Sequence, residues 1–166
     1  MTEDSMKSFT DNVVVITGAG SGIGQALARA FADEGAIVVA TDRDPQGLEV
    51  TRRLLIGERH RFLELDVTDR QALIALAAMI ARELGGADIV INNAGVALSQ
   101  TVDKLEIDDF RWLMDINFWG VVHGTQAFLP EMLKHRKGTI VNISSLFGLI
   151  GVPTQSAYNA SKFAVR

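Results

Sequence analysis

The feature that most constrains the fold of this chain is a glycine-rich stretch between an apolar run and an amphipathic segment. The apolar run covers residues 13–16, the glycine-rich stretch covers 17–24, and the amphipathic segment covers 25–34 with Gly35 as a stop signal. A strand, a glycine turn and a helix in this order provide the context that a dinucleotide phosphate site requires. The stretch therefore predicts a nucleotide-binding unit, with an ordinary tight turn as the alternative for the glycines alone.

Glycine suits such a turn for two reasons. It adopts backbone angles that are closed to other residues, and it lacks the Cβ atom that would collide with a pyrophosphate. The helix behind the turn presents unpaired N–H groups and the positive end of its dipole to an anion. The spacing of Gly18, Gly22 and Gly24 is one residue wider at its start than G-x-G-x-x-G, so the triplet alone is weak evidence.

Composition limits the classes of function. The chain has 166 residues, enough for one domain with a sizeable core, and 48% of them are hydrophobic, yet no apolar run is long enough to span a membrane. We therefore expect no membrane partner, and the acidic, polar residues 1–5 do not resemble a secretory signal. The absence of cysteine excludes disulfides and thiolate metal sites and favours a cytoplasmic location. A net charge of −4 argues against nucleic acid as a partner.

Two further features are interpreted as structural. The three histidines lack the spacing of metal ligands, so we expect no metal site, and we expect His123 to be packed or capped at the edge of the core. The basic run at residues 134–137 lies at the predicted C-terminus of a helix, where cations complement the helix dipole. That position favours a helix end over a contact with nucleic acid.

Short apolar runs alternate with helical patterns along the whole chain. Strands are predicted at residues 12–16, 36–40, 61–65, 87–91 and 139–143, and helices at 25–34, 45–55, 68–84, 107–134 and from 155 onwards. Thr68 with Gln71 has the pattern of a capping box, and Pro130 is expected to kink or divide the long helix. The alternation predicts an α/β fold with a parallel sheet and right-handed crossovers. Residues 1–11 are expected to form a polar arm before a single domain, residues 12–166.

Polar residues or glycines stand where each predicted strand ends. They are Gly18, Asp42, Asp66, Asn92 and Ser145. Ligands of parallel α/β sheets bind outside the carboxyl ends of the strands, where these residues would meet. The coincidence favours a site over a set of unrelated turns.

Tyr158 and Lys162 are four residues apart in a helical context, so they share one helix face. A free phenol has a pKa near 10 and is a poor base at neutral pH, whereas a neighbouring ammonium favours the phenolate. Ser145, thirteen residues before the tyrosine, ends the adjacent strand and can donate to a substrate oxygen. These residues indicate proton transfer, with a solvent-exposed Tyr–Lys pair as the alternative.

With these residues together, the sequence resembles the short-chain dehydrogenase/reductase family. The resemblance is carried, in the family's order, by Thr17-Gly18-Ala19-Gly20-Ser21-Gly22-Ile23-Gly24, Asn92-Asn93-Ala94-Gly95, Asn117, Ser145 and Tyr158-Asn159-Ala160-Ser161-Lys162. It covers nearly the whole chain after the N-terminal arm. It implies a Rossmann-type, doubly wound sheet in the order 3-2-1-4-5, and NAD(P)-dependent hydride transfer between a nicotinamide and a small alcohol or ketone.

The resemblance implies four catalytic roles. Tyr158 would be the general acid/base, and Ser145 would hold and polarise the substrate oxygen. Lys162 would bind the nicotinamide ribose and lower the pKa of Tyr158. Asn117 would hold a water that links the lysine to solvent, with a polar group satisfied inside a packed helix as the alternative.

The resemblance also implies a set of cofactor contacts. They are Gly18, Ser21, Gly22, Ile23, Gly24, Asp42, Arg43, Asp66, Val67, Asn93, Ala94, Gly95, Tyr158 and Lys162. The glycine turn would cradle the pyrophosphate, Asp66 and Val67 would contact the adenine, and residues 93–95 would line the ribose. The alternatives are a solvated loop at Asp66 and, for residues 92–95, a turn that only braces the sheet.

The choice of cofactor depends on the end of the second predicted strand. The Asp42 carboxylate would accept hydrogen bonds from a ribose 2′-hydroxyl and repel a 2′-phosphate, which favours NAD. Arg43 could pair with that phosphate, so NADP stays possible.

The chain ends four residues after Lys162, where the family normally continues with two further strands and substrate-covering segments. We therefore expect the strand at 139–143 to leave an exposed apolar edge, and the isolated chain to show weak or absent turnover. The family implies a homo-oligomer, although the spacing of Trp112, Phe118 and Trp119 favours the core over an oligomer face. The alternatives to an oxidoreductase are a non-catalytic dinucleotide-binding or interaction module and, disfavoured by the glycine spacing, a sugar-nucleotide epimerase or dehydratase.

Overall fold

Strand β1 (Val13–Thr17) lies at the centre of the sheet in the computed structural model, which describes residues 9–166. All five of its residues are buried. Val15 packs against the helices on one face of the sheet, and its neighbours Val14 and Ile16 pack against those on the other. Alternate residues of a strand point to opposite faces, so a strand covered on both sides is apolar throughout. This burial on both faces explains the uninterrupted apolar run of β1.

The described chain forms one five-stranded parallel sheet in the order β3-β2-β1-β4-β5, which is the order that the family resemblance implied. The other strands are β2 (Ile37–Asp42), β3 (Arg61–Glu64), β4 (Ile89–Asn92) and β5 (Thr139–Asn142). The α-helices are α1 (Gly22–Asp33), α2 (Pro45–Leu54), α3 (Arg70–Leu84), α4 (Ile107–Met114), α5 (Gly120–His135) and α6 (Ser156–Val165). A π-helical turn, η1 (Asp115–Trp119), joins α4 to α5, and a 3₁₀ turn, η2 (Leu146–Gly148), follows β5. Predicted strand ends differ from these by one or two residues.

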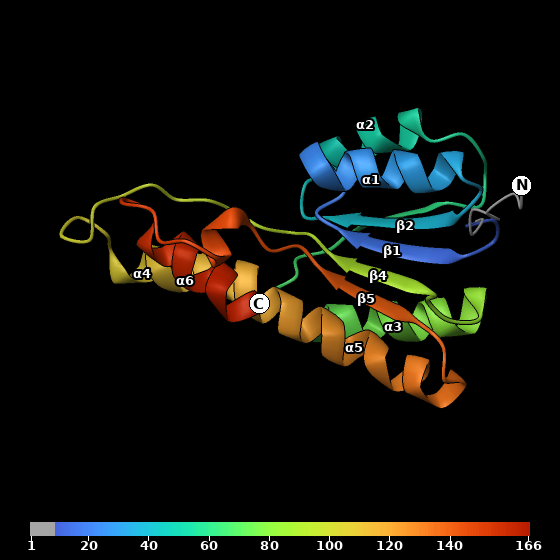
Figure 1. The fold of residues 1–166 in the computed structure, drawn as a ribbon. Coiled ribbons are helices and arrows are strands. Elements are labelled where there is room, and N and C mark those ends of the chain that lie inside the picture. The colour runs from blue at the N-terminus through green and yellow to red at the C-terminus, as the bar shows by residue number, and fades with distance from the viewer. Residues whose placement is uncertain (1–8) are drawn as a thin grey trace, which may run out of the picture.

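Helices cover both faces of the sheet, as a doubly wound α/β fold requires (Figure 1). Helices α1 and α2 lie on one face, where Ala28 and Leu48 join the core. Helices α3 and α5 lie on the other, where Leu76 and Phe128 do the same. Helices α4 and α6 pack together beyond the carboxyl ends of β4 and β5 (Figure 1). They therefore extend the edge of the sheet at which the strands end.

Two predicted helix starts are wrong. Helix α1 begins at Gly22 rather than at residue 25, so the last glycines of the turn form its first turn. The capping residue of α3 is Asp69 rather than Thr68, because the Asp69 carboxylate accepts from the backbone N–H groups of Gln71 and Ala72 at 2.9 and 3.0 Å. A carboxylate satisfies two N–H groups and also complements the positive end of the helix dipole.

The interruption of the long helix was predicted at the wrong place. Helix α5 runs through Pro130 without a break, and the irregularity is the π-helical turn η1, which directly precedes α5. Proline removes one N–H from the helix ladder. The buried side chains Phe128 and Met132, on either side of Pro130, hold α5 against the sheet, and such packing supplies most of the stability of a helix.

Of the three aromatic residues that were predicted in the core of this helical segment, Phe118 is partly buried, and the prediction is wrong for the two tryptophans. Trp112 and Trp119 are 40% and 48% exposed. They lie on α4 and η1, which extend past the sheet, so only part of their surface meets the rest of the described domain.

The two ends of the domain differ in their contacts. Residues 1–8 of the predicted polar arm lie outside the described part of the chain. Phe9, which follows them, packs edge-on against Phe31 of α1 at 5.0 Å between ring centroids. At the other side, β5 is an edge strand with Val141 37% exposed, as predicted. Among residues 9–166, no helix has both the length and the apolar character needed to cross a membrane.

Candidate active site

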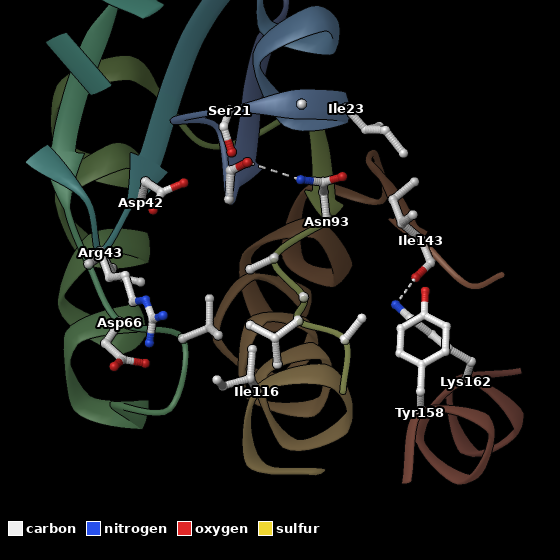
Figure 2. A pocket seen from close by; sticks show the side chains of 18 of the residues that line it. Ser21, Ile23, Asp42, Arg43, Asp66, Asn93, Ile116, Ile143, Tyr158 and Lys162 are labelled. Carbon is white, nitrogen blue, oxygen red and sulfur yellow. Dashed lines mark hydrogen bonds between the residues drawn. The ribbon is translucent and has the colours of Figure 1, made fainter. Parts of the chain in front are cut away.

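A cavity of about 460 Å³ lies at the carboxyl ends of the strands (Figure 2). It is lined by Gly18, Ser21, Gly22, Ile23, Asp42, Arg43, Leu65, Asp66, Val67, Asn93, Ala94, Gly95, Val96, Ala97, Ile116, Ile143, Ser144, Tyr158 and Lys162. Every strand of the sheet ends at this cavity, and α6 contributes its far side. The volume is in the usual range for sites that hold a small molecule or a cofactor.

The glycine turn forms one wall and leaves open space where a side chain would otherwise stand. Gly18 has a φ of 67°, and a Cβ atom there would lie 2.7 Å from the Cα atom of Ala94. Gly22 has a φ of 52°, and a Cβ atom there would meet no other atom within 4 Å. Because Gly22 is also the first residue of α1, the N-terminal end of this helix opens onto the cavity. This is the arrangement expected of an anion site.

Gly24, predicted as a cofactor contact, does not line the cavity. A Cβ atom at this position would collide with the carbonyl oxygen of Gly18. Its structural part is therefore the close packing of α1 against the turn.

Asn93 braces the glycine turn from the end of β4. Its side-chain amide donates to the carbonyl oxygens of Thr17 and Gly18 at 2.9 and 3.1 Å, and its backbone N–H donates to the Thr17 hydroxyl oxygen. The Asn93 side chain thus has the bracing role that was the alternative interpretation of this motif, and Asn93, Ala94 and Gly95 all line the cavity.

Three charged residues lie together at one end of the cavity (Figure 2). Asp42 Oδ2 accepts from the backbone N–H of Gly20 at 2.8 Å, and Oδ1 accepts from that of Asp44 at 3.0 Å. Asp66 Oδ1 accepts from the backbone N–H and the hydroxyl of Thr68, both at 2.8 Å. Arg43 is exposed beside them. The two carboxylates are held by these bonds and still have lone pairs for further donors.

Tyr158 and Lys162 of α6 form the opposite end of the cavity (Figure 2). The Lys162 ammonium is 5.7 Å from the centroid of the Tyr158 ring and donates to the carbonyl oxygen of Ile143 at 2.9 Å. Lys162 is only 4% exposed, and this burial lowers its pKa below the ordinary value of 10.5. The phenol oxygen and the ammonium point toward the same space in the cavity. The pair is therefore not a solvent-exposed helix face.

Ser145 and Asn117 were predicted in the catalytic set but do not line the cavity. The Ser145 hydroxyl oxygen accepts from the backbone N–H of Phe147 at 3.2 Å, which leaves its proton for another acceptor, and the Phe147 ring packs edge-on against Tyr158. Asn117 is fully buried in η1. Its side chain pairs with both backbone groups of Val96, at 2.8 and 2.9 Å, and donates to Ser161 Oγ at 3.1 Å.

The burial of Asn117 matches the alternative of a satisfied polar group inside a helix. Gly95 nevertheless places this side chain near the lysine, since a Cβ atom at Gly95 would lie 3.3 Å from Asn117 Oδ1 and 3.6 Å from Lys162 Nζ. Asn117 thus ties the loop after β4 to the helix that carries Lys162.

Six cavity residues were missed by the sequence analysis: Leu65, Val96, Ala97, Ile116, Ile143 and Ser144. Each is one or two residues from a predicted site residue. Their position at the strand ends and beside Asn117 was the available signal, but apolar side chains there are equally expected in the core.

Other features fit structural interpretations. His123 donates through Nδ1 to the carbonyl oxygen of Val67 at 3.2 Å and stacks on Trp119, so it is capped at the edge of the core. Among residues 9–166, no group of three or more His, Asp or Glu side chains is arranged to hold a metal ion.

Comparisons with known proteins agree with this geometry. A family model described as short chain dehydrogenase matches residues 12–166. The oxidoreductase named SadH of Mycobacterium tuberculosis is 50% identical over 163 residues, which are 97% of this chain and 59% of that protein. The chain therefore spans about three fifths of the length of this relative.

Solved structures show the same likeness. The crystal structure of levodione reductase matches with a TM-score of 0.91 and 32% identity, over 95% of this chain and 63% of that one. A short chain dehydrogenase/reductase from Burkholderia phymatum, in complex with NAD, matches with a TM-score of 0.89 and 35% identity, over 96% and 58% of the two chains. With the glycine turn, the strand order and the match over residues 12–166, the chain belongs to the short-chain dehydrogenase family.

Proposed function

We propose that the protein transfers a hydride between NAD and a small alcohol or carbonyl substrate. The observation that carries the proposal is the single cavity in which the glycine turn and the Tyr158–Lys162 pair face each other. A dinucleotide needs an anion site at its middle and a proton donor or acceptor beside its reactive end. This cavity offers both, because the glycine turn forms one wall and the Tyr158–Lys162 pair forms one end.

The residues present fit the cofactor. The open space at Gly22 and the start of α1 suit a pyrophosphate, and Asp42 and Asp66 suit the hydroxyl and amino groups of an adenosine. When bound, the nicotinamide would supply the hydride acceptor or donor. Lys162, at the other end, would donate to the hydroxyls of the nicotinamide ribose.

Tyr158 would handle the proton of the reaction. In alcohol oxidation its phenol oxygen would take the proton of the substrate hydroxyl, and in reduction it would return a proton to the carbonyl oxygen. The nearby Lys162 ammonium would stabilise the phenolate form by charge, and Ser145 would donate to the substrate oxygen. Asn117 would keep the lysine-bearing helix in place and support a water path to Lys162.

Asp42 supports NAD over NADP. The carboxylate is held at the cavity by two backbone N–H groups, so a 2′-phosphate would meet a fixed negative charge. The related structure from Burkholderia phymatum was described with NAD. Arg43 lines the same end of the cavity and could pair with a 2′-phosphate, so NADP is the weaker alternative.

We further propose a cytoplasmic homo-oligomer. The exposed Trp112 and Trp119 give α4 and η1 an apolar surface that a second copy could cover. Size-exclusion chromatography with light scattering on the full-length protein checks this, and a strict monomer would contradict it.

The test of the function uses the full-length protein, NAD and a panel of secondary alcohols and ketones. Tyr158→Phe keeps the ring and removes the proton-carrying hydroxyl. We expect kcat to fall by about 100-fold or more, with the Kd for NAD unchanged. Ser145→Ala should also lower kcat, and Ser144→Ala tests the neighbouring hydroxyl that lines the cavity. Ser99→Ala, whose hydroxyl pairs with that of Thr154 and lines no part of the cavity, is the control for loss of a serine hydroxyl.

Two results would contradict these assignments. Absence of hydride transfer across the panel, with NAD still bound, would favour the non-catalytic binding module. A larger loss of kcat in Ser144→Ala than in Ser145→Ala would move the substrate-holding role to Ser144, which lines the cavity.

A further inference from the structure

The peptide groups of Ala19 and Gly20, inside the glycine turn, are held by four hydrogen bonds from outside it. On the donor side, the Ala19 N–H donates to the carbonyl oxygen of Thr41 at 2.9 Å, and the Gly20 N–H donates to Asp42 Oδ2 at 2.8 Å. Both acceptors lie at the end of β2. The N–H groups of this part of the turn are therefore turned inward and do not face the cavity.

The two carbonyl oxygens are held by side chains from helices. The Thr51 hydroxyl donates to the Ala19 carbonyl oxygen at 2.8 Å. The side-chain amide of Gln25 donates to the Gly20 carbonyl oxygen at 3.3 Å and to Thr51 Oγ1 at 2.9 Å. Thr51 is fully buried in α2, more than 30 residues after the turn, and Gln25 is in the first turns of α1.

Close packing accompanies these bonds. A Cβ atom at Gly47, one helical turn before Thr51, would lie 2.8 Å from the carbonyl oxygen of Gly20. Helix α2 thus touches the turn through a glycine and a threonine on the same face. Neither Thr51, Gln25 nor Gly47 lines the cavity.

We propose that Thr51 and Gln25 are positioning residues for the cofactor: they hold the glycine turn in its binding conformation before the dinucleotide arrives. The inference rests on the NAD binding proposed above. It assigns α2 a part in cofactor affinity although no residue of α2 lines the cavity.

The physical reason lies in the Ala19 carbonyl. If the Thr51 hydroxyl were removed, the Ala19 carbonyl oxygen would lose its side-chain donor. Because Ala19 is fully buried, water could not replace that donor. A buried carbonyl without a partner is unfavourable, and rotation of the peptide toward water relieves it. Only the fraction of molecules that keeps the original turn could then bind the pyrophosphate, and the apparent affinity falls by that fraction.

If Thr51 only stabilises the fold, the expected result is different. Loss of the hydroxyl would then lower the free energy of unfolding of the free and the NAD-bound protein equally. The Kd for NAD would not change, because binding depends only on the difference between the two states.

The test measures dinucleotide affinity by isothermal titration calorimetry on this chain, with NAD and with ADP-ribose. Thr51→Val keeps the shape of the side chain and removes the hydroxyl. We expect the Kd for both ligands to rise roughly tenfold, the equivalent of one hydrogen bond, and Thr51→Ser to restore most of the affinity. Thr125→Val is the matched control, because the Thr125 hydroxyl bonds to Asn92 and lines no part of the cavity.

Gln25→Met provides a second variant on a partly exposed position, in case loss of the buried hydroxyl prevents folding. It should weaken binding of both ligands in the same direction, and its effect should be smaller in the Thr51→Val background because the two side chains share a hydrogen bond.

The outcomes separate the two proposals. Wild-type affinity in both Thr51→Val and Gln25→Met overturns the inference and leaves the proposed function standing. Failure of the wild-type chain to bind either ligand overturns the proposed cofactor binding, and the inference with it. Weakened binding in Thr125→Val by the same factor also overturns the inference, since loss of a threonine hydroxyl away from the turn would then suffice.

Discussion

Among the single residues of the cavity, Lys162 combines burial with a charge. Only 4% of the residue is exposed, and its ammonium donates to the carbonyl oxygen of Ile143. Removal from water disfavours the charged form, which is why burial lowers the pKa of Lys162. The fold therefore gives up some stability to keep a cation beside Tyr158.

The unfavourable burial of the charged Lys162 predicts that the stability of the protein depends on pH. Because the folded pKa lies below 10.5, the unfolded chain binds more protons at Lys162 than the folded chain between the lowered pKa and 10.5. The free energy of unfolding contributed by this residue consequently rises with pH across that window. Lys162→Met removes the rise, so we expect the variant to gain most, relative to wild type, at neutral pH and least near pH 10.5.

Urea unfolding of both proteins at neutral and alkaline pH measures the difference. Lys104→Met, at an exposed lysine, is the control for loss of a positive charge. A difference between Lys162→Met and wild type that stays constant or grows with pH would contradict the prediction.

Which residues line the cavity could largely be predicted from the sequence, while the hydrogen-bond partners of their side chains could not. The family resemblance implied fourteen cofactor contacts, and thirteen of them line the cavity. Of the five residues that the strand ends alone indicated, Gly18, Asp42 and Asp66 line it. Gly24 does not line the cavity and packs against the glycine turn, and the side chain of Asn93 lines the cavity and also holds that turn. Which atom a polar side chain bonds depends on distances across the fold, and Thr51 shows how far along the chain such a partner can be.

At the scale of elements, two neighbouring residues, Thr68 and Asp69, could each cap the start of α3. The structure assigns the cap to Asp69, which accepts from two backbone N–H groups. We expect Asp69→Ala to lower the free energy of unfolding by about 1 kcal/mol, and Thr68→Ala to change it by less than about 0.5 kcal/mol. Chemical denaturation of the two variants measures both values, and a larger loss in Thr68→Ala would restore the capping box expected from the sequence.

The π-helical turn η1 is the element that sequence patterns missed. Apolar periodicity continues through α4, η1 and α5, so nothing in the pattern marks a widened turn. The turn brings Asn117 into the interior, where its amide bonds to the loop after β4 and to Ser161 of α6. The site depends on this irregularity, and π-helical turns occur frequently at functional sites.

At the scale of the whole molecule, the layered fold follows from the alternation of apolar strands and amphipathic helices. That alternation identified the parallel sheet, and the family resemblance supplied its strand order, which the structure confirms. The edge position of β5 and the exposed Trp112 and Trp119 mark surfaces that this chain does not cover within residues 9–166. The relative from Mycobacterium tuberculosis is longer, with 59% of its length matched.

The central claim is that one cavity holds a dinucleotide from the carboxylates at its β2 and β3 end to Tyr158 and Lys162 of α6. The most direct test is a comparison of backbone amide NMR shifts on addition of NAD and of ADP, which lacks both the nicotinamide and its ribose. We expect both ligands to shift the amides of the glycine turn and of Asp42 and Asp66, and only NAD to shift those around Tyr158 and Lys162. Shifts from NAD that leave α6 unchanged, or that appear outside the cavity, would contradict the claim.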